Sequence, residues 1–142
     1  MAYATKQDLI DRFGELELIQ LTDRTIPPVA IDDDVMARSL GDAAATIDSY
    51  LGKVYALPLA AVPPVLVKVG CDLARYFLYG HRADKDGGVE RAYLQAIGWL
   101  KDVSRGLVSL DVGGAVPAQA GGGSIRAEGP ERVFSRDSLR GL

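Results

Sequence analysis

Cysteine and histidine are almost absent from this chain, and their scarcity excludes several kinds of chemistry. Of its 142 residues, one is a cysteine, Cys71, and one is a histidine, His81. A single cysteine cannot form a disulfide within the chain or a multi-cysteine metal site. A single histidine removes most zinc sites and leaves a Ser-His-Asp type of catalysis dependent on partners for His81. We expect Cys71 to be an inert apolar residue within a helix, and His81 to be exposed at a helix end after Gly80.

Long apolar runs are also missing from the sequence. The uninterrupted apolar stretches fall well short of the roughly 18 to 20 residues that span a bilayer. Residues 1–6 have no charged region followed by an apolar run, so they do not resemble a secretory signal. The sequence therefore predicts no membrane partner and synthesis in a cytoplasm.

Positive charge is scarce as well, and it is unevenly distributed. The formal net charge is −3. This argues against a protein whose main function is to bind nucleic-acid phosphates, because affinity for phosphates comes largely from Lys and Arg. Residues 1–112 hold 12 Lys and Arg against 16 Asp and Glu, whereas residues 113–142 hold four Arg against three acids. The body is thus mildly acidic and the C-terminal part mildly basic.

No set of residues carries a recognisable catalytic or metal-binding pattern. The run Asp32-Asp33-Asp34 is followed by Val35-Met36-Ala37, which supplies none of the alternating ligands of a calcium loop. Acidic residues favour the positive end of a helix, so this run predicts a helix start. The stretch Gly121 to Ser124 lacks the Lys and the following helix of a phosphate-binding loop. We expect no enzyme activity, no cofactor and no metal.

The apolar spacing predicts an all-α fold, a small bundle of about four to five helices with an extended C-terminal arm. Thr5 and Asp8 form a capping pattern, Gly14 ends the first helix, and Pro64 opens a later one. Asp72 and Arg75, three residues apart in one helix, are predicted to pair. The segments expected to be helical are 5–14, 15–21, about 33–55, 64–79 and about 89–105, and a short extended segment is expected at 107–112.

The composition changes after residue 112. Residues 113–124 are dominated by Gly and Ala and carry no charge, which predicts a flexible tether. Residues 125–142 place apolar side chains between arginines. A segment that folds onto a partner needs apolar anchors of this kind and a flexible tether that lets them reach the partner. The alternative is a disordered tail without a partner. We predict a helical domain (1–112), a tether (113–124) and a docking arm (125–142). The partner-binding residues of the arm are Arg132, Phe134, Arg136, Leu139, Arg140 and Leu142.

An ordered set of short segments gives the chain a family resemblance that covers nearly its whole length. In this order they resemble the small neck proteins of Mu-like tailed phages. The segments that carry the resemblance are Tyr3-Ala4-Thr5, Asp8-Leu9, Phe13-Gly14, Asp42-Ala43, Ile47-Asp48-Ser49-Tyr50-Leu51, Tyr55-Ala56-Leu57-Pro58-Leu59, Cys71-Asp72-Leu73-Ala74-Arg75-Tyr76, Arg91-Ala92-Tyr93, Ile97 and Val133-Phe134-Ser135-Arg136-Asp137-Ser138-Leu139-Arg140-Gly141-Leu142.

The resemblance implies a head-to-tail adaptor, also called a connector or head completion protein. Such a protein is made in the cytoplasm of the bacterial host and resides in the virion, at the head–tail junction. It forms a ring, expected to be twelve-fold, beneath the portal. Its partners are the portal protein, neighbouring copies of itself and downstream neck or tail proteins, while genome DNA only passes through the lumen. The family pattern has no catalytic residue to carry over.

A ring subunit must bury surface against two neighbours. The 64–79 helix is apolar nearly all round, which predicts a buried central helix or one whose second face meets another subunit. The small residues 43–45 let another helix approach closely. We therefore expect subunit packing to involve Ala43, Ala44, Leu66, Val69 and Phe77, and the arm to dock on the portal or an adjacent subunit.

Three other classes of function remain open at the level of sequence. A small DNA-binding regulator needs a basic recognition helix, and neither 33–55 nor 89–105 has a basic face. A small hydrolase needs His81 or the acidic residues to lie together in a pocket, and the sequence does not indicate such a pocket. A generic helical oligomer without a phage role needs only the apolar helix faces.

Overall fold

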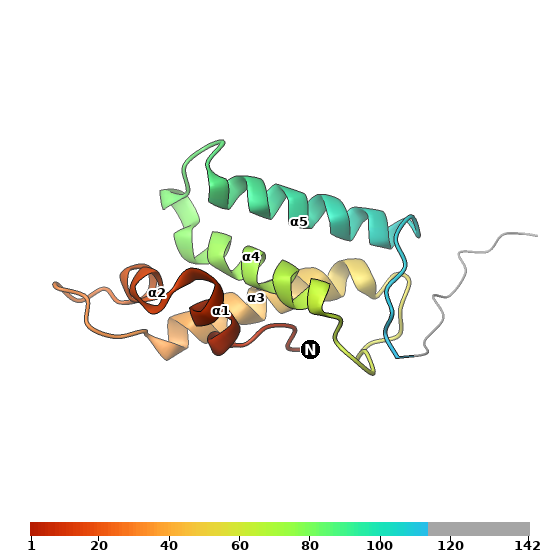
Figure 1. Cartoon of the computed structure of the whole chain (residues 1–142), viewed down its shortest axis with the longest axis horizontal. Helices are drawn as coiled ribbons and strands as arrows, with labels where there is room; N and C mark the ends of the chain where they lie inside the picture. The colour runs from red at the N-terminus through yellow and green to blue at the C-terminus, as the bar shows by residue number, and fades with distance from the viewer. Residues whose placement is uncertain (114–142) are drawn as a thin grey trace, which may run out of the picture.

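The structure is a computed structural model that describes residues 1–113 of the chain. This part contains five α-helices and one short 3₁₀-helix, and none of its residues forms a strand. The predicted all-α fold is confirmed. In chain order the elements are α1 (Lys6–Phe13), α2 (Glu15–Thr22), α3 (Asp33–Leu51), α4 (Pro64–Tyr79), η1 (Gly80–Arg82) and α5 (Gly88–Ser104) (Figure 1).

The helices begin at the local signals that the sequence carries. The Thr5 hydroxyl accepts a hydrogen bond from the Asp8 N–H, and the Asp8 carboxylate accepts one from the Thr5 N–H. These bonds satisfy backbone donors that the first turn of α1 leaves free. The Asp32 carboxylate caps α3 by accepting bonds from the N–H groups of Asp34 and Val35, at 3.0 and 3.1 Å. The acidic run is therefore a helix start, as predicted.

The helices end close to their predicted bounds, with one exception. Gly14 has a φ of +86°, which lets the chain turn from α1 directly into α2. Helix α3 ends at Leu51, whereas the periodicity predicted a helix to about residue 55. The N–H groups of Val54 and Tyr55 both bond to the Leu51 carbonyl, so this stretch forms a tight turn. Val54 and Tyr55 are still buried, which explains why they extend the apolar stripe.

Helix α4 occupies the centre of the bundle. It contacts every other helix, and Figure 1 shows it running between α5 and α3, with α1 and α2 packed beside it. Its apolar side chains therefore face partners within the chain in nearly every direction, which confirms the prediction of a buried central helix. Gly70 lets the N-terminal segment approach α4 closely, because a Cβ there would lie 3.2 Å from the Cβ of Ala4. The buried residues of α4 are Leu66, Val69, Gly70, Cys71, Asp72, Leu73, Ala74 and Leu78.

Polar side chains join α4 to its neighbours. The buried Ser39 hydroxyl donates to the Ala74 carbonyl at 2.7 Å and links α3 to α4. The predicted Asp72–Arg75 pair is wrong: Lys68 binds Asp72 at 2.7 Å, one turn away on the same helix. Arg75 instead forms a two-point bond with Glu17 of α2, at 2.7 and 3.0 Å. A guanidinium gains more from two parallel bonds to one carboxylate than from a single contact along its own helix.

The segment after α5 closes one end of the core. Leu110 and Val112 are buried while Ser109 and Asp111 are exposed, which is the alternation expected of an extended segment. The Leu110 N–H donates to the Tyr55 hydroxyl at 2.8 Å and fastens this segment to the turn after α3. The described part of the chain ends here, beside Ala60 and Ala61.

The central position of α4 predicts a strong effect of truncating one of its buried side chains. Leu73 is 0% exposed, so Leu73→Ala removes apolar burial and leaves a cavity, which lowers the free energy of unfolding by about 2–5 kcal/mol. The matched control is Leu94→Ala in α5, where the side chain is 57% exposed and we expect a change within about 0.5 kcal/mol. Urea unfolding followed by circular dichroism measures both. Equal losses in the two variants contradict the central role of α4.

Candidate docking surface

Three of the five predicted subunit-packing residues lie inside the core of the chain itself. Ala43, Leu66 and Val69 are buried among the helices α3, α4 and α5 and the N-terminal segment. Their side chains have no surface left for a neighbouring copy, so this part of the prediction is corrected. Ala44 and Phe77 are partly exposed and remain available for a contact between subunits. The predicted arm residues, Arg132 to Leu142, lie outside the described residues.

The loop between α2 and α3 exposes large apolar side chains. Within residues 23–31, Ile26 is 97% exposed and Val29 is 75% exposed. Figure 1 shows this loop extending beyond α2 at one end of the molecule. Apolar side chains that stand this far out of a folded body gain nothing from folding, and only contact with another surface would bury them.

The backbone of this loop is nevertheless held in a defined shape. The Asp23 carboxylate accepts hydrogen bonds from the N–H groups of Thr25, Val29 and Ala30, at 2.9, 2.8 and 3.2 Å. The buried Thr22 hydroxyl accepts a bond from the Asp32 N–H at 3.0 Å and donates to the Leu18 carbonyl. These bonds tie the two ends of the loop together. We refer to residues 23–31 as the Asp23 loop.

The bonds to Asp23 also fix its charge. The N–H groups of Val29 and then Thr25 stabilise the carboxylate, and they hold the pKa of Asp23 well below its usual range. The side chain is therefore negatively charged at neutral pH, with its oxygen atoms directed at the loop's own backbone. It acts as a structural anchor for Ile26 and Val29.

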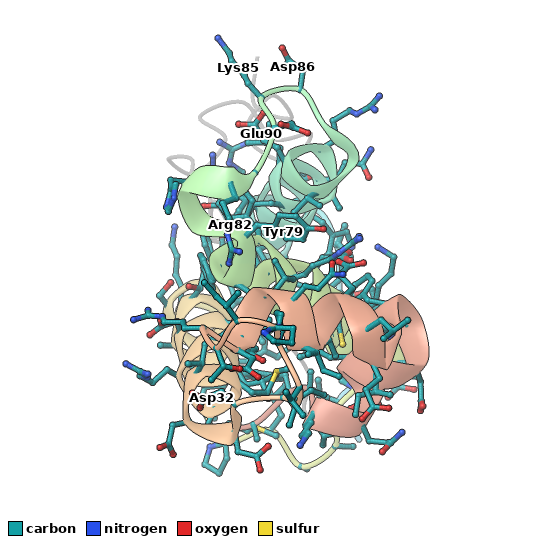
Figure 2. The ribbon with its side chains drawn as sticks, turned by 90° about the vertical axis from the view of Figure 1, so that its left-hand side faces the viewer. Asp32, Tyr79, Arg82, Lys85, Asp86 and Glu90 are labelled. Atoms are coloured by element: carbon teal, nitrogen blue, oxygen red, sulfur yellow. The ribbon has the colours of Figure 1, made fainter. Side chains whose placement is uncertain are left out.

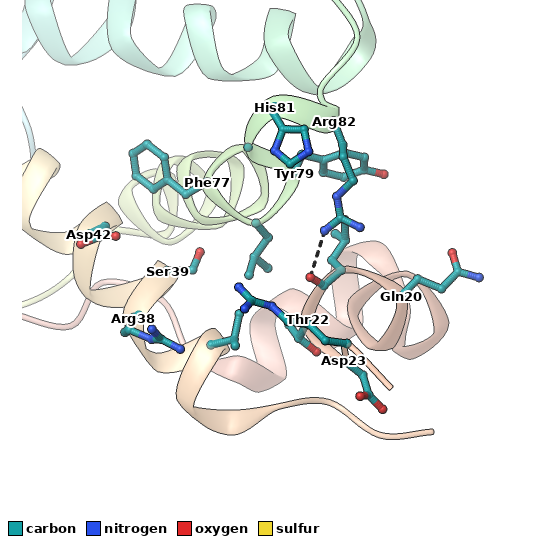
Figure 3. Close-up of a pocket in the computed structure, with 15 residues that line it drawn as sticks. Gln20, Thr22, Asp23, Arg38, Ser39, Asp42, Phe77, Tyr79, His81 and Arg82 are labelled. Atoms are coloured by element: carbon teal, nitrogen blue, oxygen red, sulfur yellow. Dashed lines mark hydrogen bonds between the residues drawn. The ribbon is translucent and has the colours of Figure 1, made fainter. Parts of the chain in front are cut away.

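An open groove of about 770 Å³ lies beside the Asp23 loop. It is formed by α2, the first half of α3, the end of α4 and η1. Figure 3 shows Arg82 and His81 on one side of it and Arg38 on the other. Arg24 also lines the groove, and Leu21, Val35 and Phe77 give it apolar surface. We call this feature the arginine groove.

The arginines of the groove are not paired with carboxylates in the described part of the chain. None of the ion pairs among residues 1–113 involves Arg24, Arg38 or Arg82. Arg82 donates to the Leu21 carbonyl at 3.2 Å, and Arg38 donates to the Asp34 carbonyl. His81 is exposed after Gly80, as predicted. The groove therefore combines apolar surface with three guanidinium groups.

The residues considered for catalysis do not come together in the described part of the chain. Cys71 is fully buried, and burial raises the pKa of its thiol to about 11, which confirms the expectation of an inert apolar residue. Residues 1–113 contain no group of three or more His, Cys, Asp or Glu side chains placed to hold a metal ion. None of their helices is both long and apolar enough to cross a bilayer.

The comparisons with known proteins define the class first: this is a protein of Mu-like phages. Residues 3–127 match the family described as "Bacteriophage Mu, Gp36". The "Mu-like prophage FluMu protein gp36" of Haemophilus influenzae is 33% identical over 141 residues, which cover 99% of this chain and 97% of that protein. "Gene product J" of Escherichia phage Mu is 31% identical over 137 residues, 96% of each chain. The chain belongs to the Bacteriophage Mu Gp36 family.

The comparisons confirm that the resemblance to Mu-like phage proteins is real. The Asp23 loop and the arginine groove, by contrast, were not identified in the sequence, which predicted only a connection between the helices at 15–21 and about 33–55. A partial signal was present, because Asp23 and Thr25 have the spacing of a side-chain turn and Ile26 stands beside two prolines. The groove has no such signal, since its arginines come from three different elements.

The three bonds to Asp23 predict the effect of removing its carboxylate. In Asp23→Ala the N–H groups of Thr25, Val29 and Ala30 lose their acceptor, so their hydrogen exchange should become about tenfold faster or more. Asp42→Ala is the matched control, since the Asp42 side chain makes no hydrogen bond among the described residues. NMR of the exchanging amides measures the effect. Unchanged exchange in Asp23→Ala contradicts the anchoring role.

The lowered pKa of Asp23 predicts how the loop responds to acid. A carboxyl group whose folded pKa lies below its unfolded value, about 3.9, stabilises the folded loop above that value. This stabilisation is lost only as the pH falls through the lowered folded pKa. Between neutral pH and pH about 4, the amide shifts of Val29 and Ala30 should stay constant. A titration of these shifts with a midpoint at or above the ordinary Asp value contradicts the prediction.

Proposed function

We propose that this chain is a head-to-tail adaptor, a structural virion protein that forms a ring beneath the portal and links the capsid to the tail. The observation that carries the proposal is the exposure of Ile26 and Val29 on a loop whose backbone is already fixed by Asp23. Membership of the Mu Gp36 family supplies the phage context. The loop is the surface through which the helical body docks on a ring-shaped partner.

A fixed apolar loop suits this role for energetic reasons. Burying an Ile or Val side chain contributes about 1.5–3 kcal/mol, and a loop that is ordered in advance loses little entropy on binding. In a ring, each subunit repeats the same contact, so a modest energy per subunit gives a stable assembly. One docking loop per subunit is therefore sufficient.

The two ends of the body are arranged for linking two partners. Figure 1 places the Asp23 loop at one end of the molecule and the segment that leads to residue 113 at the other. Residues 125–142, which follow the tether, form the second contact in the proposal and dock on the portal or an adjacent subunit. In this arm Phe134, Leu139 and Leu142 act as anchors. Arg132, Arg136 and Arg140 pair with carboxylates.

The remaining partners follow from the same role. Neighbouring copies form the ring, downstream neck or tail proteins bind its distal side, and genome DNA passes through the lumen without being held. An acidic lining suits that passage, because like charge prevents trapping of phosphates. The excess of acids in residues 1–112 supports this part of the proposal.

Binding to a purified portal ring tests the proposal. The full-length chain is compared with a chain that ends at Gly123, with Ile26→Ser/Val29→Ser, and with the control Leu94→Ser/Leu107→Ser. Leu94 and Leu107 are exposed apolar residues outside the loop. Removing two apolar contacts should weaken binding about 100-fold in the loop variant and leave the control unchanged. The truncated chain should also bind more weakly.

The outcomes separate the parts of the proposal. Equal binding by all four chains keeps the adaptor role and moves the contact to another face of the body. Loss of binding in the truncated chain alone assigns the contact to the arm. A full-length chain that binds no portal ring refutes the adaptor role and favours a generic helical oligomer or a regulator.

A further inference from the structure

The arginine groove has the chemistry of a receptor for an acidic, partly apolar surface. Arg24, Arg38 and Arg82 have no carboxylate partner among residues 1–113. The acids that line the groove are Asp23, whose carboxylate is taken up by three backbone N–H groups, and Asp42. Apolar lining beside guanidinium groups favours a protein surface over a nucleic acid, because a phosphate backbone makes no use of the apolar part.

The corner between α1 and α2 is acidic on balance: its exposed charges are Asp11, Arg12 and Glu15. Leu16 is 78% exposed there, and the neighbouring Asp11 and Glu15 are exposed acids. Neither acid belongs to an ion pair among the described residues; Asp11 only accepts a bond from the Gln7 amide. We call Asp11, Glu15 and Leu16 the acidic corner.

The acidic corner is held rigidly on the bundle. Glu17, two residues after Glu15, forms the two-point bond with Arg75 of α4. The guanidinium of Arg75 also lies over the Phe13 ring, 4.3 Å from its centre, and so clamps the end of α1 and the start of α2 together. A contact made by this corner loses little conformational entropy on binding.

The groove and the corner lie at opposite ends of α2. The corner is formed at the start of this eight-residue helix, whereas Leu21 and Thr22 at its end line the groove, about 10–12 Å away. Figure 2 looks at this end of the molecule, with Arg82 above Asp32 on one side and α2 running across the view. Two different surfaces of one subunit that bind each other make a head-to-tail contact, which forms a ring when the rotation between subunits closes.

We propose that the arginine groove of one copy receives the acidic corner of the next copy. Asp11 and Glu15 pair with Arg24 and Arg38, and Leu16 packs on the apolar lining. The inference rests on the proposed ring-forming function and names the contact between its subunits. It also gives Phe77, which lines the groove, the role in subunit packing that the sequence predicted for it.

Two variants that each lose one surface test this contact. The groove variant is Arg24→Glu/Arg38→Glu and the corner variant is Asp11→Arg/Glu15→Arg. In the parent chain at millimolar concentration, we expect self-association that either variant weakens about tenfold or more. A mixture of the two should associate again, because the intact groove of the corner variant fits the intact corner of the groove variant and the two charge-reversed surfaces also complement each other. NMR of labelled corner variant, titrated with unlabelled groove variant, should show shifts in the groove residues.

Two further chains control for nonspecific effects of charge and for misfolding. The chain with all four substitutions exchanges the charges of both surfaces, so it should associate again. Lys53→Glu/Lys101→Glu reverses two exposed lysines elsewhere and should behave as the parent chain. Restored association in the four-substitution chain shows that the single-surface variants lost association because of charge repulsion and not because of misfolding.

Several results overturn the contact. They are an unshifted groove on mixing, no recovery in the four-substitution chain, or association of both single-surface variants at the parent level. If a short DNA duplex shifts the NMR signals of the groove residues and the groove variant, which has an intact corner, does not, the groove is a phosphate-binding site instead. Portal binding of the corner variant, whose substitutions lie outside the Asp23 loop, keeps the two proposals apart: retained portal binding with failed mixing removes only this contact. Absent portal binding by the parent chain removes the adaptor role, and the mixing result still decides the contact.

Discussion

The rest of the structure depends on covering α4. A helix with apolar residues on nearly every side cannot face water, so all the other elements have to lie against it. Helices α3 and α5 cover two sides, and the N-terminal segment reaches a third where Gly70 leaves room for Ala4. The remaining surface is covered by the short helices α1 and α2. Their position follows from this requirement and from the bond between Arg75 and Glu17.

The surfaces proposed for binding arise as a consequence of this arrangement. Helix α2 and the start of α3 both lie against α4. The loop that joins them runs outside the core, so its side chains cannot be buried there. Hydrogen bonds take the place of burial there, through Thr22 at the base of the crossing and Asp23 within it. The apolar side chains of Ile26 and Val29 are thereby left in water, next to a groove whose arginines reach in from neighbouring elements.

Much of the fold could be predicted because its signals are local. The capping pair Thr5 and Asp8, the helix start at Asp32 and the opening of α4 at Pro64 each depend on residues within a few positions of one another. The errors concern choices between distant partners. Arg75 binds Glu17, 58 residues away, and Ala43 and Val69 pack inside the chain although their helix faces suit a second subunit equally well. Periodicity shows that a face is apolar, and it does not show what covers it.

The same distinction between local and distant signals applies to the candidate surfaces. The sequence by itself determined the all-α fold, the bounds of most helices, the buried character of Cys71 and the family of phage proteins, because each of these depends on spacing along the chain. Only the tertiary structure decided which apolar residues stay in water and which charges lie together. Arg24, Arg38 and Arg82 come from a loop, from α3 and from η1, and packing around α4 alone brings them to one groove. Proximity in space depends on the whole set of contacts, and no short stretch of sequence records it.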